Sequence, residues 1–169
     1  MFCFIPCFSC VNLWLKQNSI LTTERYKHMK WFLTCIFVKK NLLNEKIKYW
    51  VDLSDYDFET AEAMLASGRY LYVGFMCHQT IEKILKAYFC SRFNEPPPYS
   101  HNLSLLSGKS GINDLLEADS KDFIDLLEPL NIEARYPTHK KELLKSLTKT
   151  RCENILLKTN KLQKWVKER

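Results

Sequence analysis

The sequence predicts an all-α fold, an antiparallel up-and-down bundle of four to five helices. Residues 70–93 form the longest segment in which apolar residues recur every three or four positions, as on a buried helix. The chain has only four glycines and six prolines in 169 residues, too few for the many turns of a sandwich or barrel. Its 46% hydrophobic and 26% charged content is typical of one globular domain.

Residues 1–42 differ from the rest and are interpreted as an N-terminal leader preceding a helical domain at 43–169. The apolar run at 1–15 is too short to span a bilayer and lacks the basic flank of a signal peptide. Two alternatives stay open: a poorly ordered leader, or sequence translated ahead of the true start, with Met29 and the region of Leu43 as candidate starts. We favour the second, because soluble proteins rarely leave so many Phe, Trp and Ile side chains unpaired. We expect no membrane span and a cytoplasmic protein.

The seven cysteines form no repeated CxxC pair. This pattern favours reduced cysteines that pack as small apolar side chains, and it predicts neither a metal site nor a cofactor.

The domain begins with a predicted amphipathic helix over residues 45–66. Gly68 follows as a left-handed cap. Because the turn is short, the helix over residues 70–93 should fold back antiparallel to the first and become the centre of the bundle.

The central helix carries two rows of side chains. His78 lies on the apolar row and is interpreted as a core histidine. On the opposite row, Glu82 is spaced to pair with Lys86.

Short elements follow the central helix. After the prolines of residues 94–99, Ser100 should cap a helix ending near Leu106, with His101 in its first turn. Residues 108–111 are expected to form a flexible loop without the spacing of a phosphate-binding P-loop. Residues 112–130 supply one helix or two, with Ser120 as the expected break.

Thr138 is expected to cap a long final helix with a thin apolar seam. Residues 139–169 hold ten Lys or Arg against three acids (+7), whereas residues 41–138 hold nine against fifteen (−6). This basic helix either meets phosphates or is a solvated surface. The predicted seam consists of Leu144, Leu147, Ile155, Leu162 and Val166.

Arg135 and His139 are the candidate functional residues, because they lie where the chain enters that helix. A helix N-terminus favours a phosphate, Arg can grip a phosphodiester, and a neutral His can exchange a proton with a ribose hydroxyl. In the alternative, Arg135 pairs with an acid such as Glu133, while Tyr136 shapes the turn.

Four motifs together resemble the HEPN domain of prokaryotes. They are Gly-x-Tyr at 68–70, HQTIEKILKA at 78–87, SHNL at 100–103 and ARYP at 134–137. The resemblance covers about residues 45–167. It implies an antiparallel helical bundle, commonly a homodimer, often encoded beside a minimal nucleotidyltransferase as a toxin–antitoxin pair.

Catalytic members of that family are metal-independent ribonucleases with four to six residues between an Arg and a His. Here Arg135 and His139 are separated by only three, so the ribonuclease motif is not matched. The resemblance implies a nucleotide- or RNA-binding module, with Arg135, Tyr136, Lys140 and Lys141 at the phosphate and Arg135 and His139 as the catalytic pair of a metal-independent endoribonuclease. The alternative is a non-catalytic helical module that binds a nucleotidyltransferase or another protein.

Overall fold

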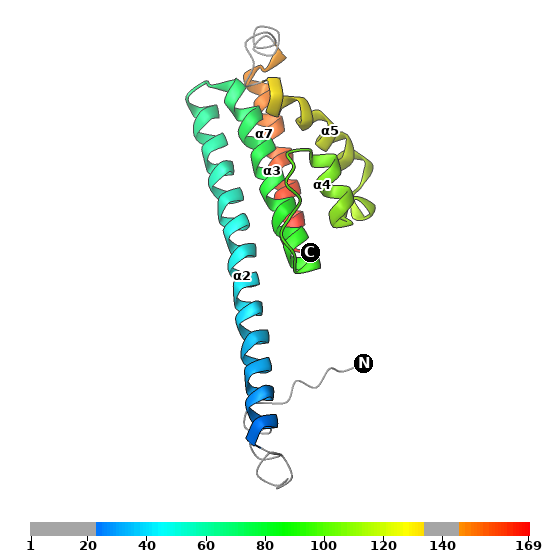
Figure 1. Cartoon of the computed structure of the whole chain (residues 1–169). Coiled ribbons are helices and arrows are strands. Elements are labelled where there is room, and N and C mark those ends of the chain that lie inside the picture. Colours follow the sequence, from blue (N-terminus) through cyan, green and yellow to red (C-terminus); the bar gives the residue numbers. More distant parts are fainter. Residues whose placement is uncertain (1–22, 134–145) are drawn as a thin grey trace. The chain divides into compact units, whose positions relative to one another are not determined.

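The computed structural model describes the backbone of residues 23–133 and 146–169. The chain separates into two compact units, Met1–Leu42 and Leu43–Arg169. Every regular element in the described ranges is a helix, which confirms the predicted all-α class (Figure 1). The interpretation of residues 1–42 as a leader stays a prediction, and residues 1–22 lie outside the described residues.

The predicted helical hairpin consists of α2 (Thr23–Ala66) and α3 (Tyr70–Phe93). The expected start of the first helix at residue 45 was wrong, since α2 begins at Thr23. The predicted cap is confirmed: Gly68 has a φ of +70°, a conformation that costs glycine least.

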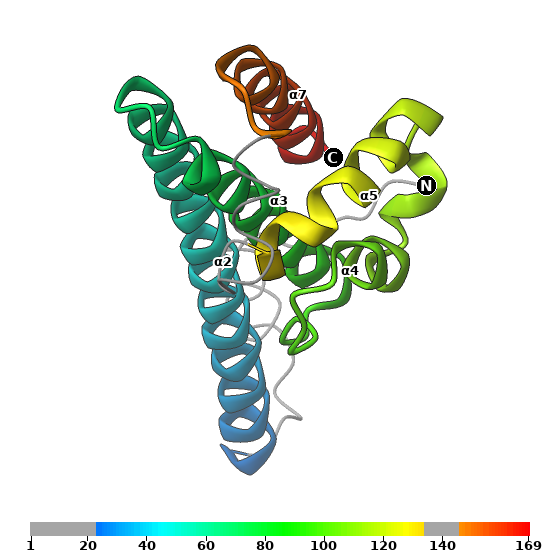
Figure 2. The same cartoon turned by 90° about the horizontal axis from the view of Figure 1, so that it is seen from above.

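Helix α3 is the centre of the bundle. It packs against α7 (Lys149–Lys167), α4 (Leu103–Ser110) and α5 (Ala118–Glu133), and Figure 2 shows these helices around it. Because it has neighbours on all sides, even its polar row is buried, including Gln79 and Glu82.

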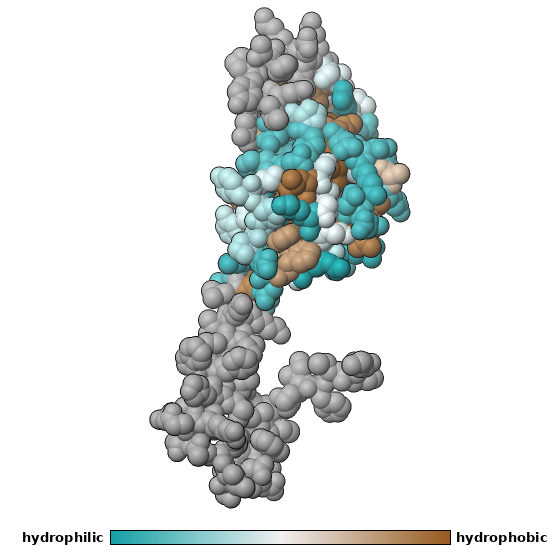
Figure 3. Space-filling model, turned by 45° about the vertical axis from the view of Figure 1, so that its right-hand side comes forward, coloured by the Kyte–Doolittle hydropathy of each residue, from teal (hydrophilic) through white to brown (hydrophobic). Residues whose placement is uncertain are grey.

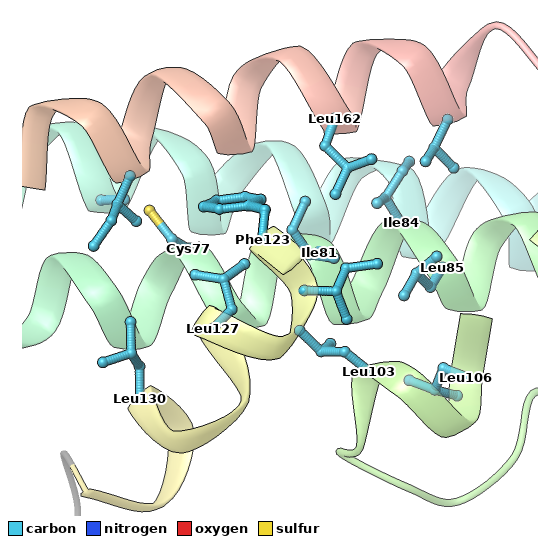
Figure 4. Packing of buried hydrophobic residues seen from close by; sticks show 14 of the residues in the cluster. Cys77, Ile81, Ile84, Leu85, Leu103, Leu106, Phe123, Leu127, Leu130 and Leu162 are labelled. Carbon is cyan, nitrogen blue, oxygen red and sulfur yellow. The ribbon is translucent and has the colours of Figure 1, made fainter. Parts of the chain in front are cut away.

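Apolar side chains from five helices, α2, α3, α4, α5 and α7, contribute to the core. Figure 4 shows Phe123 of α5 and Leu162 of α7 directed toward α3. Gly74 allows α5 to come close, since a Cβ there would lie 2.9 Å from Leu130 Cδ1. The described cysteines Cys77, Cys90 and Cys152 are free and buried, and burial raises the pKa of Cys77 to about 12, so its thiol stays protonated.

A buried hydrogen-bond network joins three helices. Ser54 Oγ of α2 donates to the Thr80 carbonyl oxygen of α3 at 2.9 Å and accepts from Gln163 Nε2 of α7 at 2.9 Å. Near the start of both helices, Cys152 Sγ lies 3.7 Å from the Tyr70 carbonyl oxygen. Helix α7 therefore runs parallel to α3, because α4 and α5 return the chain to the end where α3 begins.

Two predicted details between α3 and α5 were wrong. Asn102, not Ser100, caps α4 by accepting from Leu105 N. Helix α4 continues to Ser110, so the expected loop begins only at Gly111, whose φ is +74°. A 3-10 turn, η1 (Ile112–Leu115), precedes α5.

The break in the next helical segment also differs from the prediction. The chain leaves the helical state at Leu116, whose backbone is extended, and α5 begins at Ala118. Ser120, the expected break, instead donates its amide N–H to the Glu117 carbonyl oxygen within the first turn.

The final helix is shorter than expected. The residues from Thr138 to Leu144 lie outside the described residues. Helix α7 is capped by Thr148, whose side chain accepts from Arg151 N at 3.3 Å. Leu147 is buried but not helical, so no single helix runs through the whole predicted seam. The seam residues on α7 are buried as predicted: Ile155, Leu162 and Val166.

Candidate functional site

The predicted site residues lie outside the described residues. They belong to residues 134–145, between the end of α5 at Glu133 and the described residues that resume at Ser146. Their roles stay predictions. The residues are Arg135, Tyr136, His139, Lys140 and Lys141.

The described domain contains a buried cluster of charged groups centred on Glu82. This side chain is 1% exposed. Its Oε1 accepts from Lys86 Nζ at 2.7 Å, as the spacing on α3 predicted, and its Oε2 lies 2.9 Å from His101 Nδ1. His101 was expected in the first turn of α4; instead it precedes α4 and links the loop there to the middle of α3.

Further partners connect this cluster to α2. Lys83 Nζ lies 3.8 Å from both Asp57 Oδ2 and Glu82 Oε1, and it donates to Gln79 Oε1 at 2.6 Å. Lys86 Nζ lies 5.1 Å from the centre of the Trp50 ring, a cation–π distance. The cluster therefore joins α2, α3 and the loop before α4.

Burial and charge act on the two carboxyl groups differently. Burial alone would raise the pKa of Glu82, but hydrogen bonds from Lys86 and His101 and the charge of Lys83 outweigh it, and the pKa lies below its usual value. For Asp57 burial is the stronger effect, and its pKa is raised despite Lys83. Glu82 is thus the ionised centre of the cluster at neutral pH.

An ionised Glu82 fixes the tautomer of His101. A carboxylate can only accept, so Nδ1 must donate and Nε2 of the neutral ring is an acceptor. The side chain of His101 is 55% exposed. The arrangement can present a proton acceptor at the surface, but its geometry serves equally to anchor the loop. His78 is fully buried, as predicted for a core histidine, with Nδ1 4.0 Å from Glu82 Oε2.

Helix α7 carries the basic surface that the charge distribution predicted. Lys158 pairs with Asp119 at 2.9 Å, and Lys167 pairs with Asp55. Lys161 and Lys164 are exposed, and no ion pair joins either of them to a carboxylate in the described parts of the chain. These two cations remain available for an external anion.

A cleft between α5 and α7, here called the α5–α7 groove, lies beside these lysines. Its volume is about 130 Å³. Apolar side chains form its floor, acidic and hydroxyl groups line it from the start of α5, and lysines line it from α7. Sequence analysis missed it, because no single segment carries its pattern. The apolar floor consists of Leu116, Phe123, Leu162 and Trp165.

A family model for the HEPN domain matches residues 47–169. The chain belongs to the HEPN domain family. The match includes α3 with the Glu82 cluster, the α5–α7 groove and the predicted site residues. This confirms the family that the sequence motifs indicated.

A solved structure has a similar fold. It is the protein TT1696 from Thermus thermophilus, with a TM-score of 0.60 and 20% sequence identity, covering 73% of this chain and 97% of that chain. At this identity the likeness supports the fold alone. The comparison with curated proteins gave no match.

No helix among the described residues is long and apolar enough to cross a membrane. Within the same residues no group of three or more His, Cys, Asp or Glu is arranged to hold a metal ion.

Proposed function

We propose that this HEPN domain is a cytoplasmic nucleotide- or RNA-binding module of a toxin–antitoxin type system. The observation that carries the proposal is the pair of exposed lysines on α7, Lys161 and Lys164, neither of which forms an ion pair among the described residues, although the charge of Lys161 also acts on Asp119. Exposed cations on one face attract a phosphate backbone, and this attraction supplies most of non-specific nucleic-acid affinity.

The predicted phosphate site lies close to that face in the sequence. Arg135, Tyr136, Lys140 and Lys141 precede α7, and we assign them to the phosphate. In the catalytic form of the proposal, Arg135 stabilises the phosphodiester charge while His139 exchanges a proton with a ribose hydroxyl, without a metal. As in the resemblance, the working unit is a homodimer, and a minimal nucleotidyltransferase is the expected partner.

RNA binding is tested with a fluorescein-labelled single-stranded RNA, by anisotropy at several salt concentrations. We expect affinity to fall with salt, and each of Lys161→Gln and Lys164→Gln to reduce the slope of log K against log salt by about 0.7. Lys48→Gln is the matched control, since Lys48 is exposed on α2 and pairs with Asp52. Binding that is independent of salt would refute the proposal.

Catalysis is tested separately, by RNA cleavage in excess chelator. We expect the parent to cleave and both Arg135→Ala and His139→Ala to lose cleavage while remaining folded. If parent and variants are equally inert, the catalytic form is abandoned and RNA binding is judged by anisotropy alone.

A second function, a non-catalytic module that binds a protein, is favoured by Leu157. This side chain is 68% exposed on α7, while Figure 3 shows the described face in view to be largely hydrophilic. Exposed apolar groups on helices are common contacts for partner helices. Leu157→Asn should abolish partner capture without changing RNA affinity if the module binds a nucleotidyltransferase through this face.

A further inference from the structure

We propose that the α5–α7 groove binds one unpaired nucleotide of an RNA strand, with the base on its aromatic floor and the phosphate at its lysines. The inference rests on the proposed function, since it takes the nucleotide to belong to RNA. It adds a binding subsite made of described residues, separate from residues 134–145.

The floor of the groove suits a flat ring. Trp165 contributes the accessible aromatic surface, because its indole is only partly buried. Phe123 lines the same groove but is 4% exposed, and Lys158 Nζ lies 5.9 Å from the centre of its ring. The groove volume of about 130 Å³ is smaller than the roughly 150 Å³ cavity that holds benzene in another protein. The groove therefore takes part of one base against the Trp165 indole and leaves the rest in solvent, and such stacking accepts any base.

Cations stand at the α7 side of the groove. Lys161 is exposed and has no ion pair in the described residues, and Lys158 lines the same wall. The guanidinium of Arg169 lies 4.7 Å from the centre of the Trp165 ring. Because Lys158 and Lys161 line the same groove as Trp165, we expect a phosphate attached to a base there to meet Lys161.

The opposite wall supplies hydrogen-bond acceptors. It is formed by Glu117, Asp119 and Ser120 at the start of α5. Asp119 already accepts from Lys158 at 2.9 Å, whereas Glu117 is exposed and forms no ion pair among the described residues. Its carboxylate favours a base that offers two N–H donors at one edge, which is guanine, over uracil, which offers one.

The three parts of the groove match the three parts of a nucleotide. An anion alone would not need the aromatic floor, and an apolar peptide would not need the lysines beside it. A guanine nucleotide uses the floor, Lys161 and Glu117 together.

The test follows the indole N–H resonance of Trp165 in ¹⁵N-labelled full-length protein, assigned from the spectrum of Trp165→Phe. The probes are GMP, UMP, guanosine and ribose 5-phosphate. We expect GMP to shift this resonance saturably, with affinity about tenfold above that for UMP. Guanosine and ribose 5-phosphate should each bind more weakly than GMP.

Variants locate the site. Lys161→Gln should weaken GMP binding and reduce the salt dependence of that binding. Trp165→Leu should weaken GMP binding at least about fivefold; because this variant lacks the indole, its binding is measured from another resonance that GMP shifts in the parent. Glu117→Gln should remove the preference for GMP over UMP. Lys149→Gln is the matched control, because Lys149 lies on α7 outside the groove and pairs with Glu153. If Trp165→Leu fails to fold, the effect of Lys161→Gln on GMP binding tests the site instead, and unchanged binding in that variant would overturn the assignment.

The outcomes separate this inference from the proposed function. If RNA binds with the expected salt dependence but GMP produces no saturable shift, the groove assignment is wrong and the proposed function stands. Ribose 5-phosphate binding as tightly as GMP would reduce the groove to an anion patch and overturn the assignment. If GMP binds but RNA does not, both the proposed function and the assumption that the bound nucleotide belongs to RNA are wrong.

Discussion

Removing the carboxylate of Glu82 tests whether the buried charged cluster holds the domain together. In Glu82→Ala, Lys86 loses its carboxylate partner although its side chain is only 9% exposed. Loss of one partner from a buried ion pair costs about 3–5 kcal/mol. We expect the lower end, about 3 kcal/mol, because His101 is 55% exposed and can rehydrate.

The measurement is urea unfolding followed by circular dichroism, with the free energy of unfolding extrapolated to water. Glu95→Ala is the matched control: Glu95 is exposed in the loop after α3, and its loss should change stability by less than about 0.5 kcal/mol. The double variant Glu82→Leu/Lys86→Met should be more stable than Glu82→Ala, because it also removes the buried Lys86 ammonium group that would otherwise lack a partner. A cost below about 1 kcal/mol for Glu82→Ala would refute a structural role for the cluster.

Three further predictions concern stability. The pKa of Glu82 is lower in the folded state than its ordinary value of 4.5. Its contribution to the free energy of unfolding is therefore present above that value and is lost as pH falls through the folded pKa. The raised pKa of Asp57 changes stability in the opposite direction. Acid titration of Glu82→Gln should therefore show a weaker loss of stability below pH 4.5 than the parent. Gly74→Ala should cost about 1–3 kcal/mol in a urea titration, since the new Cβ would lie 2.9 Å from Leu130 Cδ1, whereas Gly108→Ala, in an open helical position, should gain up to about 1 kcal/mol. Thr148→Ala should cost about 1 kcal/mol through loss of the α7 cap, whereas an unchanged midpoint would show that the cap is not needed.

Local patterns predicted most of the helices. The spacing of Glu82 and Lys86 and the cap at Gly68 depend on neighbouring residues, and both are confirmed. Capping was less predictable, because Ser100 and Asn102 are both good caps two positions apart. Asn102 is the cap in the structure, and the preceding residue His101 contacts Glu82, which lies 19 positions earlier in the sequence. The spacing of apolar residues along a helix does not reveal such a contact.

The parts of the site that the sequence missed all depend on packing between distant segments. The α5–α7 groove combines the start of α5 with the second half of α7, and neither segment carries a binding motif by itself. The burial of the polar row of α3 has the same origin, since it required α4, α5 and α7 to surround one helix. Arg135 and His139 stay predictions, because they lie in residues 134–145.

The described residues on either side of residues 134–145 belong to helices that pack on the same part of α3. On one side, α5 approaches α3 through Leu130 over Gly74 and through Asn131, whose Oδ1 accepts from Gln79 at 3.4 Å. On the other, α7 begins beside the start of α3, where Cys152 Sγ lies 3.7 Å from the Tyr70 carbonyl oxygen. The positions of the described residues that flank Arg135 and His139 in the sequence are therefore set by how α5 and α7 pack on the first half of α3. A change such as Gly74→Ala, which touches no proposed phosphate contact, should alter RNA affinity through this packing, whereas Gly108→Ala should leave it unchanged.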